Sequence, residues 1–266
     1  MGHKGIILAG GTGSRLHPIT LAVNKHLLPI YDKPMVYYPL TTLINAGIRD
    51  ILLISTKTDL TLFHTLLGDG SKFGVKITYA MQDVPNGISE AFIIGRDFIG
   101  KDSVTLILGD NVFWGNEVKE GLEQSIKFAL VKRATIFGYK VKDPKRYGVM
   151  SFNSNGDLIA VDEKPDKPKS NYAVIGMYTY PNNVIEYVKD VKPSYRGEGK
   201  LDELEITTLN QIYLDKGELV NRLIGGGNLW ADTGTHESLL QASQAVAMLQ
   251  DRLGVPVGCP DCHLKG

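Results

Sequence analysis

Short apolar runs that end in glycine or in polar residues recur through the first half of the chain. They predict strands at residues 4–9, 49–55, 76–81 and 103–108. Between these runs, apolar positions repeat as they do on one face of a helix and predict helices at about residues 34–46 and 88–98. Strands and helices that alternate at this spacing are typical of an α/β protein with a mostly parallel central sheet.

The pattern changes in the middle of the chain. Asn155-Gly156 separates two strand-like runs, and this dipeptide favours a hairpin with a type I′ turn. Alternation along the second run places Ile159, Val161 and Glu163 on one face. A further strand is expected at residues 173–180, and helices at 204–214 and 235–249. We interpret the hairpin as a β-rich insertion that covers one side of the sheet, within a single domain of residues 1–266.

Composition and charge indicate which kinds of binding partner to expect. Hydrophobic residues make up 43% of the chain, which is enough for a large buried core. Lys+Arg and Asp+Glu number 29 each and no basic block occurs, so nothing favours nucleic acid or an anionic membrane as a partner. No apolar run reaches about 18 residues, and no secretion signal is recognisable. We therefore expect a cytoplasmic protein that binds small molecules.

Two cysteines lie close together near residue 260. The run Cys259-Pro260-Asp261-Cys262-His263 matches the C-x-x-C-H pattern of covalent haem attachment, which normally accompanies export. One pair of cysteines is also only half of a four-ligand zinc site. We interpret the motif as incidental.

The strongest chemical signal is the glycine-rich run Gly10-Gly11-Thr12-Gly13, directly after the first predicted strand. Glycines let backbone N–H groups approach phosphate oxygens closely, although a tight turn alone would also use them. The run is not a P-loop, which ends in Gly-Lys-Ser/Thr. It is not a dinucleotide fingerprint either, because Leu16 stands where the third glycine is needed.

Two cations, Arg15 and Lys25, follow on the same long loop. Open α/β sheets bind ligands at the carboxyl ends of their strands, where this loop begins. Both side chains could neutralise a triphosphate there. They could equally be solvated surface charges.

Three carboxylates stand at the ends of predicted elements. Asp110 follows an apolar strand, and a carboxylate in that place is a ligand type that Mg²⁺ prefers. Asp232 precedes a helix, and its position alone favours a helix-capping role. Glu163 ends an apolar stripe, where its charge needs a ligand or partner or else protects a sheet edge.

Several blocks of sequence, taken in order, resemble the glucose-1-phosphate thymidylyltransferase family: LAGGTGSRL, PITLAVNKHLLPIYDKPMVYYPL, LLGDGSKFG, LGDN, DPKRYGV, EKP, KSNYAV and WADTGTHESL. The resemblance runs from residue 4 to about residue 260. It implies a Rossmann-like nucleotidyltransferase fold with a β-rich, sugar-covering insertion. The implied halves are a nucleotide-binding half at about residues 1–133 and a sugar-binding half at about 134–232, followed by a C-terminal helix and tail at 233–266.

The resemblance also implies a reaction and the residues that perform it. A deoxythymidylyl group passes from dTTP to glucose 1-phosphate with Mg²⁺, as in deoxysugar (rhamnose) synthesis, and pyrophosphate leaves. Nucleotide binding is implied for Leu8, Ala9, Gly10, Gly11, Thr12 and Gly13, and reading of the pyrimidine edge for Gln82 and Gly87. Pyrophosphate stabilisation is implied for Arg15 and Lys25, and Mg²⁺ binding for Asp110 and Asp232, which replaces the cap interpretation. The implied sugar-site residues are Asn111, Tyr147, Gly148, Glu163 and Val174, with Lys164 and Arg196 on the sugar phosphate.

Alternatives stay open within and beyond this class. One is a pyrophosphorylase for UDP-sugars or other NDP-sugars with the same fold, with UTP in place of dTTP. Another is a catalytically silent nucleotide-sugar sensor, although such a protein would not need every charge at Arg15, Lys25, Asp110, Lys164 and Asp232. The missing third glycine argues against a nicotinamide-dependent oxidoreductase.

The chain departs from the family pattern R-G-E-L-E-I-T-D, because it carries extra residues after Arg196 and has Thr208 in place of the final Asp. We expect a homo-oligomer, either a dimer or a tetramer. Longer members bear a C-terminal extension that resembles part of a regulatory site between subunits. Since much of it is missing before Gly266, we expect little feedback by a downstream deoxysugar nucleotide.

Overall fold

The computed structural model describes residues 2–195 and 202–264, which divide into two compact units. The glycine-loop unit, as we call it, holds residues 4–84, 107–119 and the described residues from 228 onward. The hairpin unit holds residues 2–3, 85–106 and the described residues between 120 and 227. Neither unit is one continuous segment. The nucleotide and sugar halves expected from the sequence are defined by their ligands and stay a prediction.

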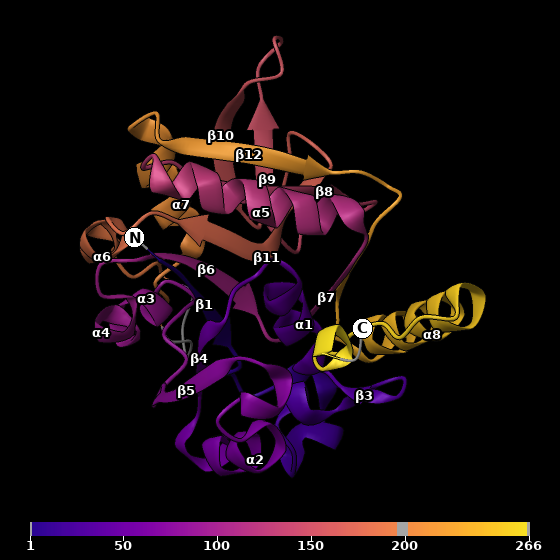
Figure 1. Ribbon diagram of the computed structural model, residues 1–266. Helices are drawn as coiled ribbons and strands as arrows, with labels where there is room; N and C mark the ends of the chain where they lie inside the picture. The colour runs from indigo at the N-terminus through magenta and orange to yellow at the C-terminus, as the bar shows by residue number, and fades with distance from the viewer. Residues whose placement is uncertain (1, 196–201, 265–266) are drawn as a thin grey trace. The chain divides into compact units, whose positions relative to one another are not determined.

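Parallel strands form the main sheet of the glycine-loop unit (Figure 1). They are β1 (His3–Leu8), β4 (Asp50–Ser55) and β5 (Lys76–Met81), in the order β1-β4-β5. Its first two helices are α1 (Tyr37–Asn45) and α2 (Lys57–Leu67). Helix α1 packs closely on β1, because a Cβ at Gly5 would lie 2.8 Å from Cδ1 of Leu43. All three strands were predicted to within a residue or two, whereas α2 was not predicted.

Two short antiparallel pairs complete this unit: β7 (Asn111–Trp114) with β13 (Leu229–Asp232), and β2 (Pro29–Ile30) with β3 (Lys33–Pro34). Helix α8 (His236–Leu253) begins with a capping box, in which Thr235 and Ser238 each bond the other's backbone N–H. One face of α8 joins a buried cluster made of Leu16, Leu28, Ile30, Met35, Tyr38, Val112, Ala242, Val246 and Val257. Strand β6 (Ser103–Leu108) carries the chain from the hairpin unit into this one.

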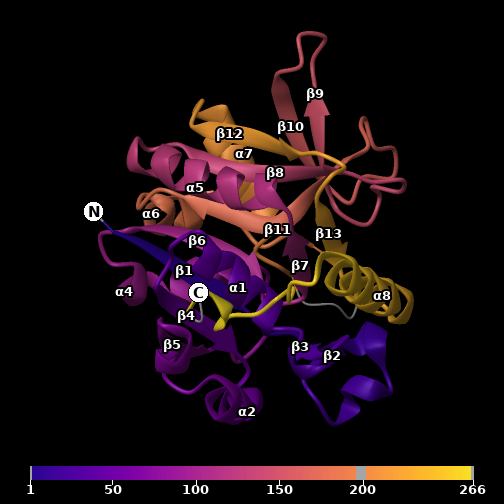
Figure 2. The ribbon, with the colours of Figure 1, turned by 45° about the vertical axis from the view of Figure 1, so that its right-hand side comes forward.

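The hairpin unit is built on a mostly antiparallel set of strands (Figure 2). They are β8 (Ala134–Lys140), β9 (Gly148–Phe152), β10 (Leu158–Glu163), β11 (Tyr172–Tyr180) and β12 (Leu219–Ile224). The pairs β10-β9, β9-β11 and β11-β8 are antiparallel, and β8-β12 is parallel. The β9–β10 hairpin projects from one end of this set in both views.

Helices flank the strands of the hairpin unit. They are α3 (Glu90–Ile94), α4 (Arg96–Ile99), α5 (Asn116–Leu130), α6 (Val184–Tyr187) and α7 (Ile206–Asp215). Helix α5 lies across β8 and β12, since a Cβ at Gly121 would meet Phe137 and Arg222. The predicted α/β class, with parallel strands and an added β-rich segment, is confirmed.

Some local predictions were wrong. The helix expected at 88–98 breaks at Gly95 into α3 and α4. The hairpin turn is not type I′, because Gly156 takes a positive φ (85°) and Asn155 does not. The reason is local: Oδ1 of Asn153 accepts bonds from the backbone N–H groups of Asn155 and Asp157, both at 2.9 Å.

The prediction of an apolar face on β10 is also wrong at its first residue, Ile159. The register of β10 against β9 shifts between Leu158 and Ala160. Ile159 therefore lies 52% exposed, whereas Val161 is 6% exposed. Among residues 2–195 and 202–264, no helix is long and apolar enough to cross a bilayer.

We predict that His3 makes the stability of the protein depend on pH. Its two ring nitrogens lie 2.7 Å from Oγ of Ser103 and 2.8 Å from Oγ1 of Thr105. Burial lowers the pKa of His3 from 6.5 to about 4, although nearby Asp102 acts in the opposite direction. The unfolded chain therefore binds more protons than the folded chain between these pH values, and the free energy of unfolding falls as pH drops through this window.

The check is urea unfolding of wild type, His3→Gln and His17→Gln at pH 7 and pH 4.5. The variant His3→Gln should lose about 2 kcal/mol less than wild type between the two pH values. His17 is exposed, so its variant is the matched control. Equal losses for wild type and His3→Gln would refute the assignment.

Candidate functional site

Segments that follow several strands meet at one edge of the glycine-loop unit. The backbone N–H of Gln82, after β5, donates to the carbonyl of Ser55 at the end of β4 (2.8 Å). The backbone N–H of Gly109, after β6, donates to the carbonyl of Leu8 at the end of β1 (2.9 Å). This edge holds Asp110, and it is where open α/β sheets bind ligands.

The glycine loop contacts the side chain of Gln82. A Cβ at Gly10 would lie 2.5 Å from Oε1 of Gln82, so only glycine permits this approach. Gly11 and Gly13 have positive φ values of 99° and 61°, which side-chain-bearing residues rarely adopt. The predicted phosphate loop, with Leu8, Ala9 and Thr12, and the predicted base-reading Gln82 thus lie together in one unit.

Lys25 and Asp110 form a buried ion pair. Nζ of Lys25 bonds Oδ2 of Asp110, and their side chains are only 14% and 12% exposed. Burial by itself raises the pKa of Asp110, but the charge of Lys25 and hydrogen bonds from Lys25 and Asn111 more than reverse this effect. The pKa of Asp110 therefore lies well below its usual range, and the carboxylate is ionised at neutral pH.

A buried polar pair fixes the segment that carries Lys25. Oδ1 of Asn24 accepts the backbone N–H of His26 (2.9 Å) and lies 2.8 Å from its Nδ1. Burial, and then the charge of Lys25, lower the pKa of His26 to about 3, so its ring is neutral at pH 7. A Cβ at Gly109 would lie 2.7 Å from this ring. The neutral ring of His26 therefore packs against Gly109, the residue directly before Asp110.

Asn111 is oriented by a residue that the sequence analysis did not select. Nε1 of Trp230 donates to Oδ1 of Asn111 (2.7 Å), and Nδ2 of Asn111 donates to Oδ1 of Asp110 (3.0 Å). An indole N–H can only donate, so the amide oxygen must face Trp230 and the amide nitrogen must face the carboxylate. Trp230 thereby fixes which way the Asn111 amide points.

Asp232 lies directly opposite Asn111 in the β7–β13 pair. Its Oδ1 accepts the backbone N–H of Gly234 (3.1 Å), and the cap of α8 is Thr235, so the helix-cap interpretation of Asp232 is wrong. The backbone N–H of the next residue, Thr233, donates to the carbonyl of Asp110 (3.1 Å). The two predicted metal ligands therefore stand on adjoining segments.

Arg15 belongs to the same group. A Cβ at Gly234 would lie 2.6 Å from Nη2 of Arg15 and 3.0 Å from Oδ1 of Asp232. The glycine at this position thus lets a guanidinium and a carboxylate approach one stretch of backbone. Both predicted pyrophosphate-binding cations, Arg15 and Lys25, lie beside a predicted metal ligand.

A second group of predicted residues lies in the hairpin unit. Oε1 of Glu163 pairs with Nζ of Lys164 (2.8 Å), and Oε2 accepts a hydrogen bond from the hydroxyl of Thr207. The backbone N–H of Lys164 donates to the carbonyl of Tyr147 (3.0 Å). Glu163 faces Gly148 across the β9–β10 pair. Thr207 was not predicted, although it supplies the partner that the Glu163 charge needs.

Of two further predicted residues, Val174 belongs to this group, whereas Gly87 contacts Leu204 in the same unit. A Cβ at Gly148 would lie 3.6 Å from Cβ of Val174 and 3.7 Å from Oγ1 of Thr207. A Cβ at Gly87 would lie 2.5 Å from the carbonyl oxygen of Leu204, so the Gly87 loop packs on the segment just before α7. Arg196 lies outside the described residues.

Lys164 has a positive φ of 42°, which is unusual for a residue with a side chain. Its side chain is 45% exposed, and the residue directly follows the strand that ends at Glu163. Strain of this kind concentrates at functional positions. It is therefore a local signal that favours a role for Lys164.

Comparisons with known proteins agree with one another. The family model described as "Nucleotidyl transferase" matches residues 4–248. A glucose-1-phosphate thymidylyltransferase of Neisseria meningitidis serogroup A is 51% identical over 256 residues, which are 96% of this chain and 86% of that protein. The one from Mycolicibacterium smegmatis is 51% identical over 259 residues, which are 97% and 87% of the two chains.

Solved structures are similar as well. One from Bacillus anthracis, assigned as a glucose-1-phosphate thymidylyltransferase and solved with sucrose, has a TM-score of 0.82 and 40% identity, with 92% of this chain and 95% of that chain covered. A UDP-glucose pyrophosphorylase with UDP-glucose has a TM-score of 0.78, with 93% and 99% covered, and at 23% identity it shows the fold alone. The chain belongs to the nucleotidyl transferase family, among its glucose-1-phosphate thymidylyltransferases.

Proposed function

We propose that the protein transfers a deoxythymidylyl group from dTTP to glucose 1-phosphate. An oxygen of the sugar phosphate attacks the α-phosphorus, the bond from that phosphorus to the bridging oxygen breaks, and pyrophosphate leaves. The named activity of relatives that are 51% identical over almost the whole chain supports this assignment. The observation that carries it is the contact of the glycine loop with Gln82 beside the ionised Lys25–Asp110 pair.

The glycine-loop unit offers what a nucleoside triphosphate requires. Backbone N–H groups of Gly11 and Gly13 can reach phosphate oxygens without steric hindrance from side chains. Gln82, with a donor and an acceptor on one amide, can pair with the edge of a pyrimidine. Arg15 and Lys25 bring positive charge to the same edge, where charge develops on the departing pyrophosphate.

The hairpin unit offers groups suited to a sugar phosphate. The half-exposed side chain of Lys164 can bring its ammonium group to this phosphate. Glu163, held by the Thr207 hydroxyl, can accept bonds from sugar hydroxyls. Tyr147, Gly148 and Val174 belong to the same group in this unit. The sugar-binding role of Asn111 stays a prediction. The role of Arg196 on the sugar phosphate stays a prediction.

The acceptor needs no activation, because a sugar phosphate oxygen is already anionic. No covalent nucleophile and no tuned general base are therefore required, and alignment and charge neutralisation account for the chemistry. The buried histidine beside the site agrees with this view, since the low pKa of His26 keeps it neutral at pH 7.

A divalent cation fits the donor set. Asp110 is ionised, and Asp232 stands on the strand segment paired with Asn111. Two carboxylates with room for phosphate oxygens are a ligand set that Mg²⁺ prefers. We propose that Asp110 and Asp232 hold Mg²⁺, which when bound neutralises phosphate charge. We also propose that the enzyme works in the cytoplasm, where nucleoside triphosphates are made, and as a homo-oligomer.

The second candidate activity is the synthesis of a UDP-sugar. Thymine and uracil present the same hydrogen-bonding edge to Gln82 and differ by one methyl group, which typically changes specificity by only about 1–3 kcal/mol. Pyrophosphate release, measured over a grid of four nucleoside triphosphates and several sugar 1-phosphates, tests both assignments. The proposal requires dTTP with glucose 1-phosphate to give the highest kcat/KM in this grid.

We predict that Asp232→Asn lowers kcat by roughly a hundredfold or more, because it removes a negative metal ligand without a change in size. Asp110→Asn should lower kcat as much and also lower the melting temperature, since it leaves the buried ammonium of Lys25 without its partner. Steady-state kinetics with varied Mg²⁺ and thermal unfolding measure both effects. The exposed Asp143 gives the control Asp143→Asn, which should match wild type. Near-native turnover of Asp232→Asn would exclude it as a ligand.

We predict that dTTP and UTP are substrates and that ATP and GTP are poor ones. A purine presents a different pattern of donors and acceptors and a larger ring to the buried Gln82 amide. The measurement is kcat/KM for all four nucleotides at saturating glucose 1-phosphate. Comparable turnover with GTP would contradict the role of Gln82.

We predict that Trp230→Phe lowers kcat about tenfold while KM for dTTP changes little, because the loss of one N–H donor releases the Asn111 amide. The second tryptophan of the chain, Trp114, lies on the paired strand β7. Trp114→Phe is therefore the matched control and should leave kcat near the wild-type value. Equal kinetics for the two variants would show that Trp230 does not act through Asn111.

A further inference from the structure

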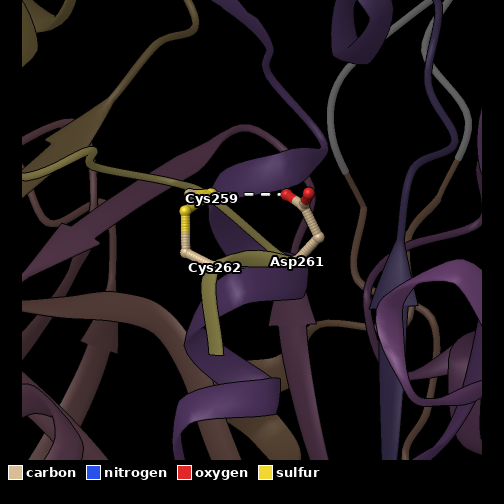
Figure 3. Close-up of side chains that lie close together, drawn as sticks. All are labelled: Cys259, Asp261 and Cys262. Atoms are coloured by element: carbon tan, nitrogen blue, oxygen red, sulfur yellow. Dashed lines mark hydrogen bonds between the residues drawn. A yellow bond between two sulfur atoms is a disulfide. The ribbon is translucent and has the colours of Figure 1, made fainter. Parts of the chain in front are cut away.

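The two cysteines of the chain are joined near its C-terminal end. Cys259 and Cys262 form a disulfide, and Oδ1 of Asp261 lies 3.3 Å from Sγ of Cys259 (Figure 3). From the sequence alone, this motif is interpreted as incidental and the bond is not predicted. Because all three side chains are half-buried, a small reductant can reach them.

The segment that carries this cluster is anchored in the glycine-loop unit. Val257 belongs to the buried cluster of that unit. A Cβ at Gly258 would lie 2.5 Å from the ring of Tyr38, so the backbone packs directly on that ring. The hydroxyl of Tyr38 in turn donates to the carbonyl of Ile30 (2.6 Å). These contacts do not involve the sulfur atoms, so they hold the segment in place whether or not the disulfide is present.

The three side chains present a compact set of ligand atoms. Both sulfurs and a carboxylate oxygen of Asp261 lie within 4.8 Å of one another, and the Cα atoms of the cysteines are 5.4 Å apart. Thiolates select soft or borderline cations such as Zn²⁺, whereas Mg²⁺ prefers oxygen ligands alone. In the disulfide state the sulfurs cannot act as thiolate ligands.

We propose that reduction turns Cys259, Asp261 and Cys262 into a binding site for a thiophilic divalent cation, with Zn²⁺ as the physiological type. A dithiol breaks the S–S bond, is oxidised to its own disulfide and passes two protons to the cysteine sulfurs. Zn²⁺ then binds both sulfurs as thiolates together with the Asp261 carboxylate, and the two protons are released. This site is separate from the proposed Mg²⁺ ligands and does not depend on the proposed reaction.

The position of the cysteines leaves room for a fourth ligand. Both line a cavity of about 330 Å³, together with residues of α1 and β7 that include Thr42 and Trp114. A water molecule in this cavity can complete the tetrahedral geometry that Zn²⁺ favours. Oxidation would expel the ion, because the disulfide uses the same two sulfurs. The site therefore responds to the redox state of its surroundings.

Cobalt binding to the whole protein tests this proposal. Since the chain has only two cysteines, any cobalt–thiolate charge-transfer absorption must come from Cys259 and Cys262. The protein is reduced with a dithiol, freed of it under inert gas, and titrated with Co²⁺ in excess Mg²⁺, which occupies sites made of carboxylates. Zn²⁺ is then added as a competitor.

The reduced protein should develop this absorption with one equivalent of Co²⁺ and lose it on addition of Zn²⁺. The oxidised protein and Cys262→Ser should not develop it. Asp261→Asn retains both cysteines and should bind Co²⁺ at least tenfold more weakly, while Asp251→Asn, an exposed carboxylate on α8, should match wild type. Absence of the absorption in the reduced protein, or unchanged affinity in Asp261→Asn, would overturn the proposal.

Discussion

The buried pair of Lys25 and Asp110 is the interaction on which the proposed site depends. Removal of two charges from water costs free energy, which their mutual attraction offsets only with good geometry and further hydrogen bonds. Asn111 provides one such bond, and the low pKa of Asp110 shows that the carboxylate keeps its charge. A negative charge that persists at the edge of the sheet can hold a cation, and the ammonium group beside it can bind phosphate oxygens.

Close approaches of backbone and side chain arrange the rest of the site. Gly10 lets Gln82 contact the glycine loop, Gly109 leaves space for the ring of His26, and Gly234 leaves space for Arg15. A methyl group at any of these positions would collide with its neighbour at 2.7 Å or less. These glycines therefore determine which side chains can approach the backbone at this edge of the sheet.

The sequence predicted the strands that precede the site because buried parallel strands are apolar throughout and end abruptly, as at residues 103–108. It also predicted the glycine loop after β1, because three glycines in four residues indicate backbone that must turn tightly or approach another group closely. Helix α5 was overlooked although Val118 and Leu122 lie on one helical face, so the signal was present. The predicted type I′ turn at Asn155-Gly156 was wrong because the side chain of Asn153 accepts a hydrogen bond from the backbone N–H of Asn155. This bond overrides the turn preference of the Asn-Gly dipeptide.

Other features depend on segments that only the folded chain brings together. The bond from Trp230 to Asn111 joins residues that are 119 positions apart, and Thr207 bonds Glu163 over 44 positions. Neither pairing has a local pattern that could reveal it. The Cys-x-x-Cys spacing is compatible with a disulfide, a metal site or chance, and only the placement of the two sulfurs and Asp261 distinguishes these outcomes.

We propose that the anionic sugar phosphate displaces pyrophosphate directly at the α-phosphorus, with no covalent enzyme intermediate. The most direct test is the reaction of glucose 1-phosphate with one diastereomer of dTTP that carries sulfur on the α-phosphate. A single in-line displacement predicts a nucleotide-sugar product with inverted configuration at that phosphorus. Retained configuration would reveal a covalent intermediate, and absence of a nucleotide-sugar product with either diastereomer and with dTTP itself would contradict the proposed reaction.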